Sequence, residues 1–365
     1  MVWFLNSQKT ETVKLIELLR TNKQQLDRIV LEFLPTKSNT AEINEMYEMM
    51  RDYPSRGGKG LRGTACLLWC ELFGGNRVNA LTTAAALELF QNWILIHDDI
   101  EDQSDLRRGQ PALHRKVGVE LAINAGDALH GKMWELLLKN RNVLSPVVTL
   151  NILTEFAMML NLTTEGQQME LSWCKQNRWD MNEKDYFQMV TKKSAWYTCI
   201  TPARLGVLVA AERNEQVGVH DFNRLLSDLV DFGTKLGVSF QIIDDVLNLM
   251  GEESKYGKEI LGDIYEGKRT LMLIHLLAES TDAQKRKIIQ IVSRPRSKKT
   301  LDEGRSVFDE MKDRGSLRYA TNTARKLSEQ ALTQYESICT EHGVRTSRHY
   351  KTVRSLVEYV TSRDY

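Results

Sequence analysis

The chain has 365 residues, of which 42% are apolar and 27% charged, and its formal net charge is +1. This composition excludes a disordered chain, and the balanced charge favours no nucleic-acid partner. No apolar run reaches the roughly 20 residues of a membrane span, and the first residues do not resemble a signal peptide. We therefore expect a cytoplasmic protein without a transmembrane segment.

The spacing of apolar residues predicts long helices. Only six prolines occur, and apolar residues recur every three or four positions in the segments 80–100, 147–162 and 222–247. No series of alternating strand patterns is visible. Stretches rich in glycine, proline and polar residues indicate loops between helices, at 52–63, 106–118, 139–146 and 251–270. We predict an all-α fold, with residues 1–365 forming one domain, a single large helical bundle around a central apolar cavity.

Two acidic clusters each follow an apolar run. Asp98 and Asp102 are four residues apart and share one face of a helix, and Asp244 and Asn248 repeat this spacing. If the two faces met inside a bundle, like charges near 4 Å would repel by about 4 kcal/mol at an effective dielectric of about 20. Cations must then lie between them. Hard oxygen ligands with open coordination positions suit Mg²⁺ shared with the phosphates of a substrate.

Basic residues flank both acidic clusters. They occur in four stretches, containing Lys59 and Arg62, Arg107 and Arg108, Lys192 and Lys193, and Lys258 and Lys268. Glycines beside the first stretch allow a backbone to approach an anion closely, and arginines bind phosphate oxygens in a bidentate manner. Acids that hold metals, combined with separate basic pockets, predict a site for more than one diphosphate.

These segments resemble those of the trans-isoprenyl diphosphate synthases, and especially of the geranylgeranyl diphosphate synthases. The matching segments follow the family's order over most of the chain: GGKGLR, DDIED, LRRGQPALH, EGQQMEL, KKSAWY, FQIIDDVLN and GKEILGDIYEGKRTL. The resemblance implies a homodimer that condenses an allylic diphosphate head-to-tail with isopentenyl diphosphate. It also implies three Mg²⁺ per active site, for which Mn²⁺ can substitute.

The resemblance further assigns roles to individual residues. It implies direct metal ligands at Asp98, Asp102 and Asp244, supported by Asp99, Asp245 and Asn248. It implies that the allylic diphosphate is bound by Arg107, Lys193 and Lys258, with Lys268 in the lid that closes over it. It implies that isopentenyl diphosphate is bound by Lys59, Arg62, Gln91 and Arg108. Polar groups beside the reacting cation would come from Ser194, Tyr197 and Gln241.

Three positions depart from the family pattern. Asn248 stands where the second acidic motif usually ends in Asp, which removes one charge. Glu170 replaces the usual Asp of the EGQQMEL segment and Ser194 replaces Thr, so both keep their chemical group and change its reach. None of these departures argues against activity.

The length of the product is predicted from residues just before the first acidic cluster. Trp93 precedes Asp98 by five residues, about 7.5 Å along a helix. In the resembling family a large aromatic residue here limits elongation, whereas Ile94 leaves more room than a second aromatic would. We therefore expect the C20 product, geranylgeranyl diphosphate. A C15 product, as in farnesyl diphosphate synthases, and a purely structural Trp93 are the alternatives.

Three other functions were weighed against this one. A type I terpene cyclase would share the fold and the metals but needs no isopentenyl pocket, so GGKGLR and Arg108 disfavour it. A phosphohydrolase using His97 and Asp98 as a metal-binding pair would need further histidines in a matching pattern, which the sequence lacks. A non-catalytic partner subunit would lack an acidic motif or a basic pocket, and this chain has both.

Overall fold

The apolar stripes expected from the sequence form helices in the computed structural model, which describes residues 2–213, 219–250 and 260–361. The helices are α1 (Val2–Phe33), α2 (Ala41–Ser55), α3 (Leu61–Leu72), α4 (Arg77–Glu101), α5 (Leu113–Val117), α6 (Val119–Leu138), η1 (Lys139–Asn142), α7 (Pro146–Lys175), α8 (Glu183–Val190), η2 (Thr191–Ile200), α9 (Thr201–Ala210), η3 (Ala211–Arg213), α10 (Val219–Met250), α12 (Gly262–Glu266), α13 (Leu271–Ala278), α14 (Asp282–Val292), η4 (Arg296–Lys298), α15 (Leu301–Asp313), α16 (Ser316–Glu341), η5 (Val344–Thr346) and α17 (Tyr350–Thr361). The predicted all-α fold is confirmed. That residues 1–365 form one domain stays a prediction.

Several helices begin at side chains that satisfy their first backbone amides. The Asn76 side chain accepts a hydrogen bond from the Val78 amide at 3.0 Å at the start of α4. Ser145 caps α7 in the same way, and Pro146 follows it at the first helical position. Ser and Asn are typical at helix N-termini because their side chains bind backbone amides that have no partner inside the helix. Pro is typical at the next position because it has no amide hydrogen that would need a partner.

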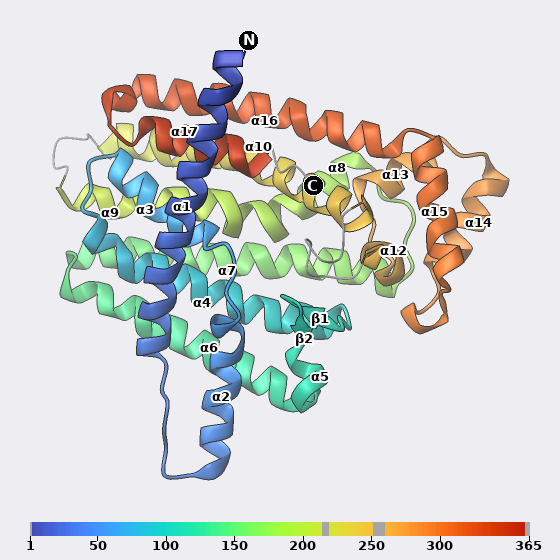
Figure 1. The fold of residues 1–365 in the computed structure, drawn as a ribbon, viewed down its shortest axis with the longest axis horizontal. Helices are drawn as coiled ribbons and strands as arrows, with labels where there is room; N and C mark the ends of the chain where they lie inside the picture. Colours follow the sequence, from blue (N-terminus) through green and yellow to red (C-terminus); the bar gives the residue numbers. More distant parts are fainter. Residues whose placement is uncertain (1, 214–218, 251–259, 362–365) are drawn as a thin grey trace.

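Long helices assemble the bundle around α4 and α10. α10 packs against α16 and η2, and α4 packs against α3 and α6. Figure 1 shows α16 running along one edge of the bundle, with α14 and α15 gathered at one end. The alanines of α4 are fully buried and allow its neighbours to approach closely, at Ala80, Ala84, Ala85 and Ala86.

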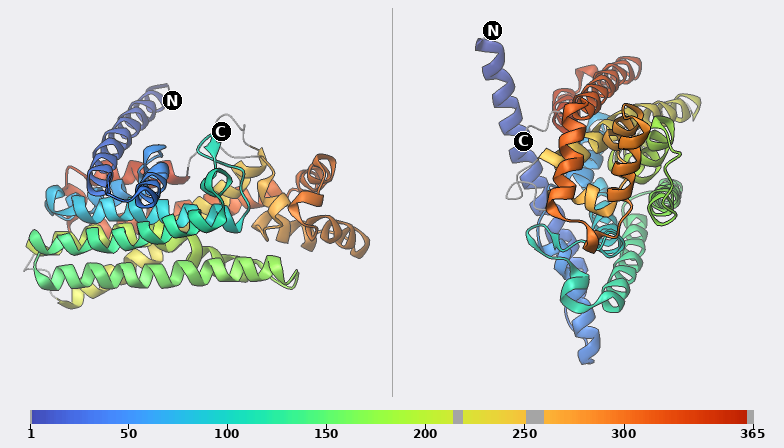
Figure 2. Two further views of the ribbon diagram at one scale, coloured as in Figure 1. Left: turned by 90° about the horizontal axis from the view of Figure 1, so that it is seen from below. Right: turned by 90° about the vertical axis from the view of Figure 1, so that its right-hand side faces the viewer.

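α6 and α7 run side by side along one face of the molecule (Figure 2). Within the described residues, α7 is the one helix long and apolar enough to cross a membrane by length and composition, and 39% of its most apolar window is buried. α7 also packs against η2 and α9 and supplies Glu170 to the central cavity. Its packing is that of a bundle member with one outward apolar face.

One small sheet interrupts the helices. Strands β1 (Leu106–Arg107) and β2 (Gln110–Pro111) pair antiparallel, with Arg107 opposite Gln110. The two residues between the strands, Arg108 and Gly109, have φ angles of 54° and 73°. Positive φ at both positions is required by the two-residue hairpin turn that matches strand twist, which explains the glycine. The loop predicted over 106–118 is therefore a hairpin followed by α5.

Candidate active site

A cavity of about 350 Å³ opens inside the bundle. Asp98 of α4 and Asp244 of α10 both line it, so the two acidic clusters share one space. The wall is mostly polar and charged, and its apolar part includes Leu61, Leu95, Met189, Val190 and Phe240. Of the predicted site residues, those that line the cavity are Lys59, Arg62, Gln91, Asp98, Arg107, Arg108, Lys193, Ser194, Tyr197, Gln241, Asp244, Asp245, Asn248 and Lys268. Those that do not are Trp93, Ile94, Asp99 and Asp102. Lys258 lies outside the described residues.

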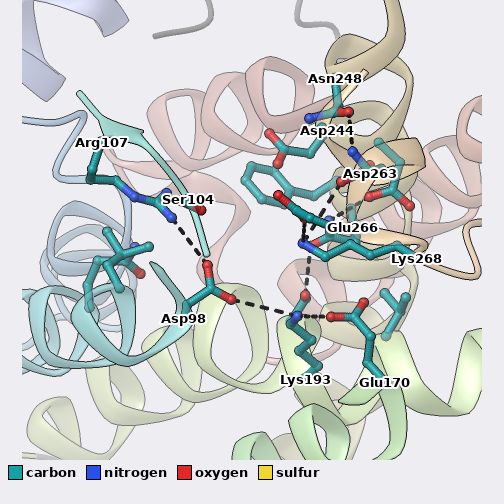
Figure 3. A pocket seen from close by; sticks show the side chains of 18 of the residues that line it. Asp98, Ser104, Arg107, Glu170, Lys193, Asp244, Asn248, Asp263, Glu266 and Lys268 are labelled. Atoms are coloured by element: carbon teal, nitrogen blue, oxygen red, sulfur yellow. Dashed lines mark hydrogen bonds and ion pairs between the residues drawn. The ribbon is translucent and has the colours of Figure 1, made fainter. Parts of the chain in front are cut away.

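The first acid of the α4 cluster faces the cavity between two cations. Asp98 Oδ2 lies 3.2 Å from Arg107 Nη2, and Asp98 Oδ1 lies 3.8 Å from Lys193 Nζ. Figure 3 shows this carboxylate placed between the two basic side chains. The next acid, Asp99, is completely buried and points away, toward the Arg107 Nε atom at 2.9 Å. Neighbouring acids of this cluster therefore have different surroundings.

In the α10 cluster both acids line the cavity, but they differ in their surroundings. Asp245 is only 8% exposed and accepts hydrogen bonds from Gln241 Nε2 and Tyr186 Oη, both at 2.8 Å. Burial raises the pKa of the Asp245 carboxyl to about 7, and these two donors only partly offset it. Gln241 also accepts a hydrogen bond from Ser194 Oγ at 2.7 Å, so a polar chain runs from η2 to the second acid of α10.

Two lysines bind the acids on the other wall of the cavity. Lys193 forms an ion pair with Glu170 of α7. Burial alone would lower the pKa of Lys193, but the nearby carboxylates of Glu170 and Asp98 outweigh burial and hold this pKa above its ordinary value. Lys268 Nζ lies 2.7 Å from Asp102 Oδ2 and 2.8 Å from Glu266 Oε2. Burial raises the pKa of the Asp102 carboxyl to about 7 in spite of Lys268. The attraction of Lys268 therefore only partly offsets the cost of burying this carboxylate.

Lys193 lies in a ten-residue π-helix, η2. This wider helix carries Ser194 and Tyr197 as well, and π-helical turns are frequent at functional sites. Gly166 of α7 allows the close approach, because a Cβ there would stand 2.2 Å from the Lys193 amide nitrogen. The glycine of the EGQQMEL segment therefore places α7 directly against the lysine that contacts Asp98.

A second group of basic residues lies on the α3 side of the cavity. Arg62 Nη2 donates to Thr198 Oγ1 at 2.8 Å, and its guanidinium lies 4.3 Å from the centre of the Tyr197 ring. Arg108 Nη1 donates to the Tyr53 carbonyl at 2.7 Å. Lys59 and Gln91 line the same cavity, and among the described residues the buried Gln91 Oε1 has no hydrogen-bond partner. Arg62 and Arg108 donate to neutral oxygens, whereas Arg107, Lys193 and Lys268 pair with carboxylates.

Comparison with known proteins identifies the family. Residues 43–311 match the polyprenyl synthetase family. The chain belongs to the polyprenyl synthetase family. Its similarity to a geranylgeranyl diphosphate synthase from Saccharolobus solfataricus is 36% identity, covering 84% of this chain and 87% of the relative. A geranylfarnesyl diphosphate synthase from Aeropyrum pernix is 30% identical, covering 75% and 82%. The crystal structure of a geranylgeranyl pyrophosphate synthetase from Pyrococcus horikoshii has a TM-score of 0.78 at 27% identity and covers 95% of this chain and 99% of that one.

These matches confirm two sequence predictions, the resemblance and the enzyme class, which is a prenyltransferase. They disfavour the phosphohydrolase, and the structure agrees. In this polyprenyl synthetase His97 does not line the cavity but packs against Gly126 of α6, with its Nε2 3.5 Å from Asp127. Burial lowers the pKa of His97. The histidine and Asp98 thus point to different places.

The three departures from the family pattern have visible partners in the structure. Asn248 Oδ1 accepts a hydrogen bond from the Asp263 amide at 3.0 Å, which ties the end of α10 to α12. Glu170 reaches Lys193, and Ser194 reaches Gln241. Each substituted side chain therefore makes a polar contact within the cavity wall of this polyprenyl synthetase.

Sequence reasoning missed four residues that shape this site. Asp263 and Glu266 of α12 line the cavity and contact Lys268. Their three-residue spacing in the segment GDIYEG was a usable signal, because it places both on one helical face. Tyr53 and Tyr186 support Asp99 and Asp245 from helices that are 46 and 59 residues away in the sequence. No local pattern could have shown these contacts.

Proposed function

We propose that the chain joins an allylic diphosphate head-to-tail to isopentenyl diphosphate and releases geranylgeranyl diphosphate. The observation that carries this proposal is the shared cavity, which Asp98 and Asp244 line together with Arg107, Lys193 and Lys268, and with Lys59, Arg62 and Arg108. A cyclase binds one diphosphate, so one set of basic residues would be sufficient for it. Two sets match two diphosphate substrates.

The cavity fits Mg²⁺ as the resident metal. Its donors are carboxylate oxygens, which Mg²⁺ prefers, and the inward carboxylate of Asp98 is already placed against cations. Asp98 and Asp244 line the cavity and would hold the metal, which supplies neutralisation of the diphosphate charge when bound. Asp102, which does not line the cavity and pairs with Lys268, stays a prediction as the third ligand. The number of three ions per site stays a prediction, as does substitution by Mn²⁺. A surface group of Asp228, Glu341 and His342 could also hold a metal, but Glu341 is paired with Arg224 and the group lies outside the cavity.

The basic residues near Asp98 would act on the leaving group. Breaking the allylic carbon–oxygen bond leaves both electrons on the diphosphate, so cations fixed around it lower the barrier. Arg107, Lys193 and Lys268 line the cavity and would provide them, and Lys258 stays a prediction in the same role. The isopentenyl double bond then attacks the allylic cation, and the departed diphosphate accepts the proton that is lost.

The opposite set would hold isopentenyl diphosphate. Lys59, Arg62, Gln91 and Arg108 line the α3 side of the cavity. Ser194, Tyr197 and Gln241 line the same cavity, and their oxygen dipoles would stabilise the cation. The Ser194 hydroxyl donates to Gln241, whose amide nitrogen is held by Asp245, so the position of the amide oxygen is fixed before substrate arrives.

Product analysis tests this function. Purified protein is incubated with isopentenyl diphosphate, Mg²⁺ and one of the C5, C10 or C15 allylic diphosphates, and the products are weighed by mass spectrometry. A C20 product is expected from each starter. A C15 end product would show farnesyl synthesis, a C25 end product would match the geranylfarnesyl relatives, and cyclised hydrocarbon without use of isopentenyl diphosphate would refute the proposal.

We also propose that the chain forms a homodimer through the α6 and α7 face. Apolar side chains are exposed there at Leu121, Leu138, Val147 and Leu150, the last with 63% of its surface accessible. Exposed apolar side chains gathered on neighbouring helices are typical of interaction sites, since leaving apolar surface in water costs about 25 cal/mol per Å². A second copy of this chain is the partner that the face would bury. A cytoplasmic location stays a prediction.

Leu150→Glu is expected to convert the dimer into monomers, because the new charge would be buried without a partner at the interface. Sedimentation velocity measures the change. Leu301→Glu is the matched control, since Leu301 is equally exposed, at 66%, but lies on α15. A Leu150→Glu protein that sediments like the Leu301→Glu protein, both as dimers, would exclude α7 from the interface.

A further inference from the structure

Tyr53 of α2 contacts Arg108 directly and Arg107 through Asp99, without reaching the cavity. Its side chain is completely buried, and it is absent from the cavity lining formed by the described residues. The phenol donates to Asp99 Oδ2 at 2.5 Å and accepts from the Leu113 amide at 3.1 Å. The Tyr53 carbonyl accepts from Arg108 Nη1 at 2.7 Å. One buried residue thus touches the partners of two cations that line the cavity.

The contact to Arg107 passes through Asp99. Arg107 Nε lies 2.9 Å from both carboxylate oxygens of Asp99, and its Nη2 contacts the same carboxylate. From that position Nη2 also reaches Asp98 at 3.2 Å. The orientation of the guanidinium in the cavity therefore depends on where the Asp99 carboxylate lies. Tyr53 and Arg107 hold that carboxylate from two sides.

The second acid pair has a similar tyrosine contact. Tyr186 of α8 donates to Asp245 Oδ2 at 2.8 Å, and Tyr186 is 1% exposed. In each pair the second acid is buried against a tyrosine from a preceding helix, although Asp245 and Tyr186 also line the cavity and Asp99 and Tyr53 do not. The other donor differs, since Asp245 is bound by the amide of Gln241 rather than by an arginine. The recurrence indicates that a phenol is part of how this fold fixes each acid pair.

We propose that Tyr53 is a positioning residue for the prenyl transfer. Its phenol fixes Asp99 and, through Asp99, holds Arg107 in the orientation that binds the allylic diphosphate. Its backbone carbonyl fixes Arg108 on the isopentenyl side. The inference rests on the proposed function, because it takes from there which diphosphate each arginine binds.

A mutation can remove the side-chain contact of Tyr53 and keep its backbone contact. Tyr53→Phe deletes the phenol oxygen and leaves both the ring and the carbonyl. Arg107 then loses its indirect support while Arg108 keeps its acceptor. The proposal therefore predicts a loss confined to one substrate, which a general loosening of the fold would not produce.

Steady-state kinetics of Tyr53→Phe test this split. The KM for the allylic diphosphate and the inhibition constant of inorganic diphosphate are expected to rise by about tenfold, the size expected for losing a hydrogen bond to a charged group. The KM for isopentenyl diphosphate is expected to change by less than about twofold, because the Arg108 contact is retained. Tyr335→Phe is the control, since Tyr335 is completely buried and donates to the Tyr350 carbonyl at 2.7 Å in another part of the core.

A double-mutant cycle tests whether Tyr53 acts through Arg107. Tyr53→Phe is combined with Arg107→Lys, and kcat/KM for the allylic diphosphate is measured for both single variants and for the double variant. The fold-loss of the double variant is expected to be smaller than the product of the two single fold-losses, because both mutations act on one contact. If Tyr53→Phe does not fold, Asp99→Asn takes its place with the same expected split. Multiplicative losses, equal effects on both substrates, or kinetics like those of Tyr335→Phe would overturn the inference. A wild-type protein without prenyl transfer would instead overturn the proposed function.

Discussion

Asp98→Asn is expected to lower turnover by about a thousandfold or more, since a bound metal contributes several kcal/mol of charge stabilisation in the transition state. The asparagine keeps the shape of the side chain but removes the charge that lies against Arg107 and Lys193. Incorporation of labelled isopentenyl diphosphate into a longer prenyl chain measures the loss. Thermal unfolding is expected to stay near that of the wild type, because Asp98 faces the cavity rather than the core.

Asp309→Asn provides the comparison for this variant. Asp309 is exposed on α15 and is not among the cavity residues, so the same chemical change there leaves turnover unaltered. Raising the Mg²⁺ concentration is expected to recover part of the activity of Asp98→Asn, since weakened ligation is offset by mass action. Full activity of Asp98→Asn at ordinary Mg²⁺ would remove this carboxylate from the metal site.

Trp93→Ala is expected to shift the product beyond C20. The indole of Trp93 stacks on the His130 ring, with centroids 4.3 Å apart and planes inclined by 11°. Phe90 meets it edge-on at 5.3 Å. These contacts hold a large ring at 7% exposure, five residues before Asp98 and one and a half turns deeper along α4. Trp93 does not itself line the cavity, so the prediction requires that the space left by the indole joins the cavity. Mass spectrometry of the products would then show chains longer by at least one five-carbon unit.

The same change carries a stability cost that needs a separate measurement. Truncating a buried tryptophan to alanine costs about 3–5 kcal/mol, so thermal unfolding is recorded beside the product distribution. Trp69→Ala is the matched variant, since Trp69 is 3% exposed and packs against Phe232 and Tyr335. It is expected to lose stability without changing product length. An unchanged product from Trp93→Ala would make Trp93 an ordinary core residue.

Periodic apolar residues were sufficient to predict the helices of the bundle. α4 and α10 cover the segments 80–100 and 222–247, because their buried positions recur at helical spacing. The hairpin of β1 and β2 was not predicted, since two-residue strands carry no periodic signal. The sequence showed only the RRG turn, whose conformation depends on the positive φ of Arg108 and Gly109.

Residue types predicted the side chains that line the cavity better than the residues that hold those side chains in place. Asp98, Asp244 and Lys193 line the cavity, as their motifs suggested. The resemblance implied that Asp99 and Asp245 support the acids beside them, but it did not indicate what holds Asp99 and Asp245 in place. The phenols of Tyr53 and Tyr186, which come from distant helices, contact the second acid of each pair, and no local pattern in the sequence shows these contacts.

The short hairpin has a consequence for how this enzyme can vary. Arg107 lies opposite Gln110 in the ladder, and Arg108 occupies the turn immediately after it. A single inserted or deleted residue there would shift the register of the two strands and displace both guanidinium groups, because strand pairing depends on the length of the turn. The two arginines proposed to bind the two substrates would then move together. Surface loops of such a protein can change in length during evolution, whereas the length of this turn must stay constant.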